Sequence, residues 1–242
     1  MKSRITSTSW LMNTPIAHRG LHGHGVPENS ISAFRRAIES GYPIETDVQM
    51  TSDGKLFCFH DDSLKRMTGL DSDIRKTDSS TIELLRLRGS DEKIPTFEQF
   101  LKFVDGRVPL LIEVKKQKEK GIEEKIADAL ADYDGEYAIQ SFDPFVLKRF
   151  SQIMPEVLRG QLSDFLCKEK NPIVRFVVKR MIFNFLSKPD FCNVNLKAAE
   201  DSITIAKGLP TLVWTVRSEE DLCIADAYGV NFVFENILAK IK

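Results

Sequence analysis

Short runs of β-branched and apolar residues alternate with helical patterns along most of this chain, and this alternation constrains the fold more than any other feature. Repeated strand and helix units predict a parallel sheet covered by helices. Eight such runs lie at residues 15–18, 44–50, 108–114, 137–141, 157–162, 191–196, 211–216 and 230–234. Eight strands with intervening helices fit a closed α/β barrel, and 242 residues suit one barrel. We therefore predict a single barrel domain over residues 1–242.

The ends of two helices can be located from capping signals. The first follows Asn29 and ends before Gly41, and apolar residues at helical spacing between them share one face. The second begins at Thr96, with Gln99 three residues later as its capping-box partner. Both helices are predicted to cover the sheet.

A ninth run, residues 55–60, follows the second strand after a turn at residues 53–54. A parallel connection needs a dozen residues or more, so this run must form an antiparallel hairpin. If the turn is a two-residue loop, Asp47 lies opposite His60. The polar and charged residues 61–93 then predict an insertion before the barrel resumes.

Composition excludes several kinds of partner and site. Basic and acidic residues number 34 and 35, so no large field of one sign indicates nucleic acid. No apolar run predicts a signal peptide or a membrane span, and we expect a cytoplasmic protein. The four cysteines are widely scattered, which indicates neither zinc nor disulfides. An anionic small molecule would therefore be bound by a local cluster of charge.

Residues 173–186 are apolar nearly all round, but they include the adjacent pair Lys179 and Arg180. This pair argues against a membrane span. The simpler interpretation is a helix of the outer ring, buried against its neighbours. The alternative is an exposed apolar flap for a hydrophobic substrate tail, a membrane surface or a subunit interface.

Three acids are predicted to lie on neighbouring barrel strands. Glu45 and Asp47 are two residues apart and share one face of their strand, and Glu113 lies near the end of the next barrel strand with Lys115 on its own face. A solvent-facing acidic pair and a Glu113–Lys115 ion pair are the simpler interpretations. Buried carboxylates need compensation, however, and an all-oxygen site suits Mg²⁺ or Ca²⁺ and not zinc.

Two histidines and an arginine lie beside these acids. His18 and Arg19 end the first strand, where barrel enzymes place their chemistry, and His60 ends the hairpin. Arg19 could bind a phosphate with two hydrogen bonds, while His18 and His60 could act as general base and general acid. His22 and His24, in a glycine-rich loop, are predicted to be exposed and incidental.

Several motifs together resemble the glycerophosphodiester phosphodiesterase family. In chain order they are IAHRG, PENS, AF, IETDV, T-x-DG, HDD-x-L-x-R-x-T, IPTFEQFL and IEVK. The resemblance is dense over residues 16–68 and 94–115. It is thinner afterwards, at residues 140–142 and 214–216 and in the final strand. Residues 234–237 depart from the Thr-Asp-x-Pro motif that is usual there.

The resemblance implies a TIM barrel with a small insertion near its early strands. It also implies cleavage of glycerophosphodiesters to glycerol 3-phosphate and an alcohol, with a divalent metal. Glu28 and Asn29 match a motif close to the site, although Asn29 as a plain helix cap explains the sequence equally well. By motif, the family's functional positions fall on His18 and His60 as catalytic residues, Glu45, Asp47 and Glu113 as metal ligands, and Arg19, Lys115 and Trp214 as substrate contacts.

In the mechanism expected from these residues, the metal and Arg19 bind the phosphodiester while one histidine activates the nucleophile and the other protonates the leaving alkoxide. The nucleophile is either water or the neighbouring glycerol hydroxyl. One alternative is a lysophospholipase D-like enzyme, with residues 173–186 covering an acyl chain. A non-catalytic phosphodiester-binding barrel is the other.

Overall fold

The structure is a computed structural model that describes residues 4–6, 8–117, 121–164, 184–198 and 208–240. Its strands form one sheet in the order β1-β9-β8-β7-β6-β5-β4-β2-β3, with β1 also paired to β2. Eight parallel strands with helices between them form a TIM barrel, and β3 is an additional antiparallel strand. The predicted fold is confirmed. Two compact units compose the chain, residues 17–137 in one and residues 1–16 with 138–242 in the other.

In the unit of residues 17–137, the central strand is β2 (Ile44–Met50), which is buried along its whole length. It pairs in parallel with β1 (Ile16–Ala17) and β4 (Leu110–Val114), and antiparallel with β3 (Leu56–Cys58). The apolar residues of β2 are Ile44, Val48 and Met50, and because the strand is buried on both faces its polar side chains need partners within the protein. The longer helices of this unit are α2 (Ile31–Glu39), α5 (Phe97–Val104) and α6 (Ile122–Leu130).

The other unit holds the remaining parallel strands. They are β5 (Tyr137–Ser141), β6 (Leu158–Ser163), β7 (Phe191–Asn195), β8 (Thr211–Val216) and β9 (Asn231–Phe234). Its helices are α1 (Trp10–Asn13), α7 (Pro144–Ile153), α9 (Asn184–Ser187), η2 (Leu196–Ala198) and α11 (Glu219–Tyr228). All eight predicted barrel strands are therefore present, and each boundary lies within two residues of its prediction.

The hairpin of β2 and β3 is antiparallel as predicted, but its predicted register is wrong by one residue. Val48 pairs with Cys58 and Met50 pairs with Leu56, so Asp47 lies opposite Phe59 and not opposite His60. The turn has three residues, because Thr51 and Lys55 close it. A two-residue type I′ turn needs positive φ at both central residues, whereas here only Gly54 has one, at 85°.

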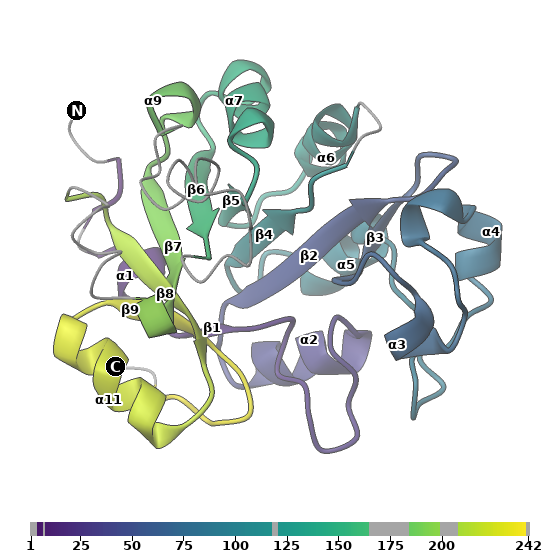
Figure 1. Ribbon diagram of the computed structural model, residues 1–242, viewed down its shortest axis with the longest axis horizontal. Helices are drawn as coiled ribbons and strands as arrows, with labels where there is room; N and C mark the ends of the chain where they lie inside the picture. The colour runs from purple at the N-terminus through teal and green to yellow at the C-terminus, as the bar shows by residue number, and fades with distance from the viewer. Residues whose placement is uncertain (1–3, 7, 118–120, 165–183, 199–207, 241–242) are drawn as a thin grey trace. The chain divides into compact units, whose positions relative to one another are not determined.

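The insertion after β3 contains three short helices around a small apolar core. They are α3 (Lys65–Thr68), η1 (Ile74–Lys76) and α4 (Ser79–Ile82), and α3 and α4 lie beside β3 in Figure 1. Its core side chains come from both the hairpin and the insertion: Phe57, Phe59, Leu64, Ile74, Ile82, Leu87 and Ile94. The predicted insertion is thus anchored to the hairpin by shared hydrophobic packing.

One predicted cap is confirmed and one is wrong. Thr96 and Gln99 form a complete capping box at the start of α5. Helix α2 begins at Ser30, whose hydroxyl accepts from the Ala33 backbone N–H, so Asn29 is not its cap.

The apolar segment 173–186 lies outside the described residues except for its last three residues, which begin α9. Among the helices described, none is long and apolar enough to cross a membrane.

Candidate active site

Three buried carboxylates meet in the unit of residues 17–137. Glu45 and Asp47 point to the same side of β2, and Asp47 is directly beside Glu113 on β4 in the parallel register. One carboxylate oxygen from each lies within 4.8 Å of the others, and the three residues are only 2%, 0% and 7% exposed. The acids singled out from the sequence therefore form one cluster.

Burial and mutual repulsion shift the pKa values of these acids. Burial, followed by the charges of Asp47 and Glu113, raises the pKa of Glu45 well above its usual value. Burial also raises the pKa of Glu113. Burial opposes ionisation of Asp47 too, but Lys115, His60 and Arg19 together hold its pKa below the ordinary range. The surroundings thus disfavour the ionised forms of Glu45 and Glu113 and favour that of Asp47.

Lys115 is the nearest cation to this cluster among the described contacts. Its Nζ lies 2.8 Å from Asp47 Oδ1 and 2.5 Å from Glu113 Oε1. The Glu113–Lys115 ion pair considered as the simpler interpretation is therefore present, and it coexists with the carboxylate cluster.

Asn29 belongs to this site through its side chain. Its Nδ2 donates to Asp47 Oδ2 over 3.0 Å, and its Oδ1 accepts from the Thr46 hydroxyl over 2.8 Å. The left-handed backbone of Asn29, with φ of 52°, points the amide away from the helix that follows. The proximity to the site indicated by the PENS motif is therefore observed.

Arg19 is held on three sides by acids. Its backbone N–H donates to Glu45 Oε2 over 3.0 Å, its Nη1 donates to Glu28 over 2.7 Å, and its Nε lies 3.4 Å from Asp47 Oδ2. The following residue, Gly20, has φ of 76°, and a Cβ there would come within 2.8 Å of the Ala33 backbone. Only glycine, which has no Cβ, lets the backbone at position 20 lie this close to Ala33. The preceding residue, Arg19, lies beside the carboxylates in this arrangement.

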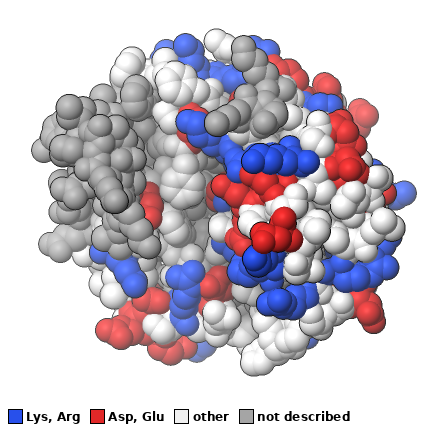
Figure 2. Space-filling view, turned by 45° about the vertical axis from the view of Figure 1, so that its right-hand side comes forward, with Lys and Arg blue, Asp and Glu red and all other residues white. Residues whose placement is uncertain are grey.

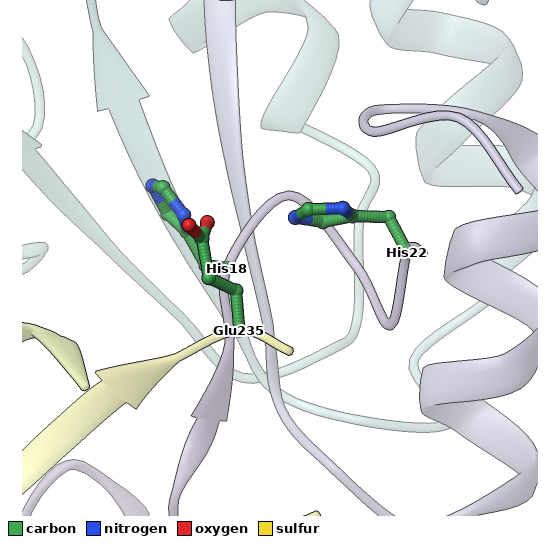
Figure 3. A group of neighbouring side chains, drawn as sticks. All are labelled: His18, His22 and Glu235. Carbon is green, nitrogen blue, oxygen red and sulfur yellow. The ribbon is translucent and has the colours of Figure 1, made fainter. Parts of the chain in front are cut away.

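The histidines after β1 differ in their surroundings. His18 Nε2 lies 4.0 Å from Glu45 Oε2, so His18 is beside the carboxylate cluster. His22 lies on the same loop, with a ring nitrogen within 4.8 Å of one on His18 (Figure 3). His24 is exposed as predicted, but His22 is half-buried, and the prediction that it is exposed is wrong.

His60 is oriented by a carboxylate and by a buried amide. Its Nδ1 lies 2.7 Å from Asp61 Oδ1. Gln49, fully buried on β2, donates from Nε2 to the carbonyl oxygens of residues 59, 60 and 61 over 3.0, 3.1 and 2.8 Å. His60 therefore lies near Asp47 although the predicted register was wrong, because the chain after β3 is fixed by Gln49.

Sequence reasoning missed Gln49, and it gave Asp61 and Arg66 no role. Arg66 donates to the carboxylates of both Asp61 and Glu28. The signal for these two was available, since Asp61 and Arg66 are fixed positions of the HDD-x-L-x-R motif. Gln49 had no such signal, because its partners are backbone atoms of another segment.

Trp214 lies on β8, in the other unit. Its ring contacts the ring of the exposed Phe142 edge-on, at a centroid distance of 5.8 Å. In the same unit, Glu235 directly follows β9 (Figure 3) and belongs to the segment that departs from the family's usual motif. Its Oε1 lies 2.5 Å from Arg217 Nε. The role of Trp214 in substrate binding stays a prediction.

Charges of both signs are intermixed on the described surface seen in Figure 2, in agreement with the balanced composition. The strong local feature is instead the buried group of acids around Arg19 and Lys115. This arrangement suits an anionic ester bound with the help of a cation.

Comparison with known families shows which family this chain resembles. The model of the glycerophosphoryl diester phosphodiesterase family matches residues 18–238. The chain belongs to this family. The family accounts for the motif series and for the TIM barrel.

Individual relatives agree with this assignment. A glycerophosphodiester phosphodiesterase of Caldanaerobacter subterraneus subsp. tengcongensis is 34% identical over 159 residues, which cover 61% of this chain and 65% of the relative. One from Bacillus subtilis is 28% identical over 249 residues, covering 91% and 82%. Among solved structures, an Oleispira antarctica phosphodiesterase in complex with its product sn-glycerol-3-phosphate has a TM-score of 0.76 at 23% identity, covering 93% of each chain.

Proposed function

We propose that this protein hydrolyses glycerophosphodiesters to glycerol 3-phosphate and an alcohol. The observation that carries the proposal is the buried cluster of Glu45, Asp47 and Glu113, with His18, His60 and Arg19 around it. Membership of the family supports the same substrate class. The product bound to the Oleispira antarctica relative is consistent with it.

The residues fit a divalent cation of the hard type. Three buried carboxylates supply only oxygen ligands, and the repulsion that raises the pKa of Glu45 would be relieved by two positive charges. Mg²⁺ and Ca²⁺ suit this donor set, and Glu45, Asp47 and Glu113 would hold the ion. When bound, such an ion neutralises negative charge on the phosphodiester.

In the proposed mechanism, the protein side chains position the ester and transfer its protons. Arg19 and Lys115 bind the nonbridging oxygens. His60 donates its Nδ1–H to Asp61, which leaves Nε2 available for proton transfer, and His18 is the second proton-transfer group. The nucleophile is water or the adjacent glycerol hydroxyl, and the latter passes through a cyclic phosphate. We also propose a cytoplasmic location, in line with Cys58 and Cys223, which form no disulfide among the described residues.

A substrate panel tests the proposal. Glycerophosphocholine, other glycerophosphodiesters and lysophosphatidylcholine are assayed for the products of cleavage after chelation and again after Mg²⁺, Ca²⁺ or Mn²⁺ is restored. We expect release of glycerol 3-phosphate that requires added metal. Faster turnover of lysophosphatidylcholine would favour the lysophospholipase D alternative, and binding without turnover would favour the non-catalytic barrel. Activity that survives thorough chelation would contradict the metal assignment.

The role of His60 is tested by His60→Ala. Loss of a proton-transfer group costs about 100-fold or more in turnover, so kcat should fall by at least this factor while the protein stays folded. His24→Asn is the matched control, because His24 is exposed on its loop. Near wild-type kcat for His60→Ala would refute the assignment.

A further inference from the structure

The guanidinium of Arg66, on α3 of the insertion, lies between two carboxylates. Its Nε and Nη2 donate to the two oxygens of Asp61 over 2.5 and 3.0 Å. Its Nη1 and Nη2 donate to the two oxygens of Glu28 over 2.9 and 2.6 Å. Arg66 thus makes a two-bond fork with each carboxylate, the geometry in which arginine fixes orientation most strongly.

Each of these carboxylates in turn holds a group of the proposed active site. Asp61 Oδ1 lies 2.7 Å from His60 Nδ1. Glu28 Oε1 accepts from Arg19 Nη1 over 2.7 Å. A continuous chain of contacts therefore runs from His60 through Asp61, Arg66 and Glu28 to Arg19.

Position and exposure indicate that this chain serves geometry more than stability. The Arg66 side chain is 48% exposed, and exposed ion pairs contribute little to folding. Glu28, at 13%, is much less exposed, and the pKa of its carboxyl is lowered because Arg66 and Arg19 outweigh its burial. Helix α3 has only four residues and is held by the core of the insertion, where Leu64 is fully buried.

We propose that Arg66 is a positioning residue for the proposed phosphodiester hydrolysis, holding Asp61 and Glu28 so that His60 and Arg19 face the same substrate. The inference rests on the proposed function for its chemistry. Without Arg66, the Asp61 carboxylate is free to rotate and the His60 ring loses its fixed tautomer and direction. Arg19 keeps its backbone hydrogen bond to Glu45 and its contact with Asp47, but the Glu28 carboxylate that accepts from its Nη1 is no longer held by Arg66.

Three variants test this role kinetically. Arg66→Met removes all four hydrogen bonds at similar length, and Arg66→Lys keeps the charge but not the fork. Lys65→Met is the control, because Lys65 is the adjacent residue of α3 and its ion pair is with the exposed Asp71, outside the chain of contacts. Loss of a partner that orients active-site groups typically costs 10- to 100-fold.

We expect kcat of Arg66→Met to fall about 10- to 100-fold and KM to rise several-fold, with Arg66→Lys regaining part of the loss and Lys65→Met close to wild type. The KM change is decisive, because partial unfolding reduces the active fraction and leaves KM unchanged. Arg66→Met with kcat and KM within twofold of wild type would overturn the inference. So would a loss that Lys65→Met reproduces.

Nitrogen-15 spectra of the histidine rings separate this inference from the proposed function. Arg66→Met should shift the His60 ring resonances and change its tautomer, whereas Lys65→Met should not. Unchanged His60 resonances in Arg66→Met would overturn the inference even in an active enzyme. Wild-type protein that cleaves no glycerophosphodiester would refute the proposed function, while an Arg66-dependent His60 signal would still show the positioning.

Discussion

Gln49 shows how one buried amide determines where a histidine lies. Its Nε2 donates to three successive carbonyl oxygens, those of Phe59, His60 and Asp61. The amide is completely buried and lies two residues beyond Asp47 on the same face of β2. The strand that supplies the carboxylates therefore also fixes the segment that carries His60.

Gln49→Leu should damage both stability and turnover. The substitution leaves buried carbonyl oxygens without a donor, which costs about 1–3 kcal/mol in the free energy of unfolding, and it frees the His60 segment. We expect kcat to fall at least about tenfold, in line with the loss of an orienting partner. Steady-state kinetics and urea unfolding measure the two effects.

Gln117→Leu is the matched control, since Gln117 makes two hydrogen bonds with the backbone of Met50. It should lose stability while keeping kcat. Equal kcat losses in the two variants would contradict a specific role for Gln49.

Sequence patterns predicted the acids of the candidate site, and the PENS motif placed Asn29 close to it, but Gln49 and the geometry of both side chains were not predicted. Glu45 and Asp47 share a face by the two-residue period of a strand, and Glu113 follows on the next barrel strand, so their meeting required only local rules. Asn29 and Gln49 depend on a left-handed backbone and on the path of another segment. Neither property is encoded in spacing along the chain.

At the scale of the element, the β2–β3 hairpin depends on its three-residue turn. The Thr51 hydroxyl lies 2.6 Å from Asp53 Oδ1 and accepts from the Lys55 backbone N–H. Asp53 also accepts from the backbone N–H and the hydroxyl of Ser79, which joins the turn to α4. These hydrogen bonds, with Ser79 contributing most, hold the pKa of Asp53 at about 2.

Asp53→Asn should reduce stability at neutral pH and have less effect in acid. The folded-state pKa of about 2 is below the ordinary value of 3.8, so the stabilisation from this carboxylate is fully present above pH 4–5 and is lost as the pH falls towards 2. The group is exposed, and the loss at pH 7 should be about 1 kcal/mol. Unfolding by urea at pH 7, 5 and 3 measures it.

Asp91→Asn, at an exposed acid of the same insertion, is the control and should show no such dependence. A loss of stability in Asp53→Asn that stays constant from pH 7 to pH 3 would contradict the assignment.

The same turn explains the one-residue error in the predicted register, because side-chain hydrogen bonds of Thr51 favoured a longer turn than Asp53-Gly54 alone indicates.

At the scale of the whole molecule, the alternation of strand and helix patterns along the sequence was sufficient to predict the barrel. The barrel strands are buried, and short runs that contain β-branched and apolar residues, such as Leu110–Val114, stand out between the helical patterns. The network from His60 to Arg19 does not follow from this alternation, because it passes through the polar insertion, where only the HDD-x-L-x-R motif marks Asp61 and Arg66.

The carboxylate cluster links metal binding to the stability of the whole molecule. Burial and neighbouring carboxylates raise the pKa values of Glu45 and Glu113, so ionisation of these two acids destabilises the metal-free fold. An ion that binds only the folded state stabilises it by mass action. At 100 times its Kd, such an ion contributes about 2.7 kcal/mol. For a chain of this size we expect Mg²⁺ or Ca²⁺ to raise Tm by about 5–10 °C relative to chelated protein.

Glu45→Gln should abolish most of this metal-dependent rise, because it removes one ligand charge. It should also raise the Tm of the metal-free protein, since the neutral amide relieves repulsion with Asp47 and Glu113. Glu98→Gln, at an exposed position of α5, should retain the full rise and serves as the control. Thermal melts of the three proteins with chelator and across a metal titration give the comparison. A rise in Tm of the same size in Glu45→Gln would show that the stabilising ion binds elsewhere.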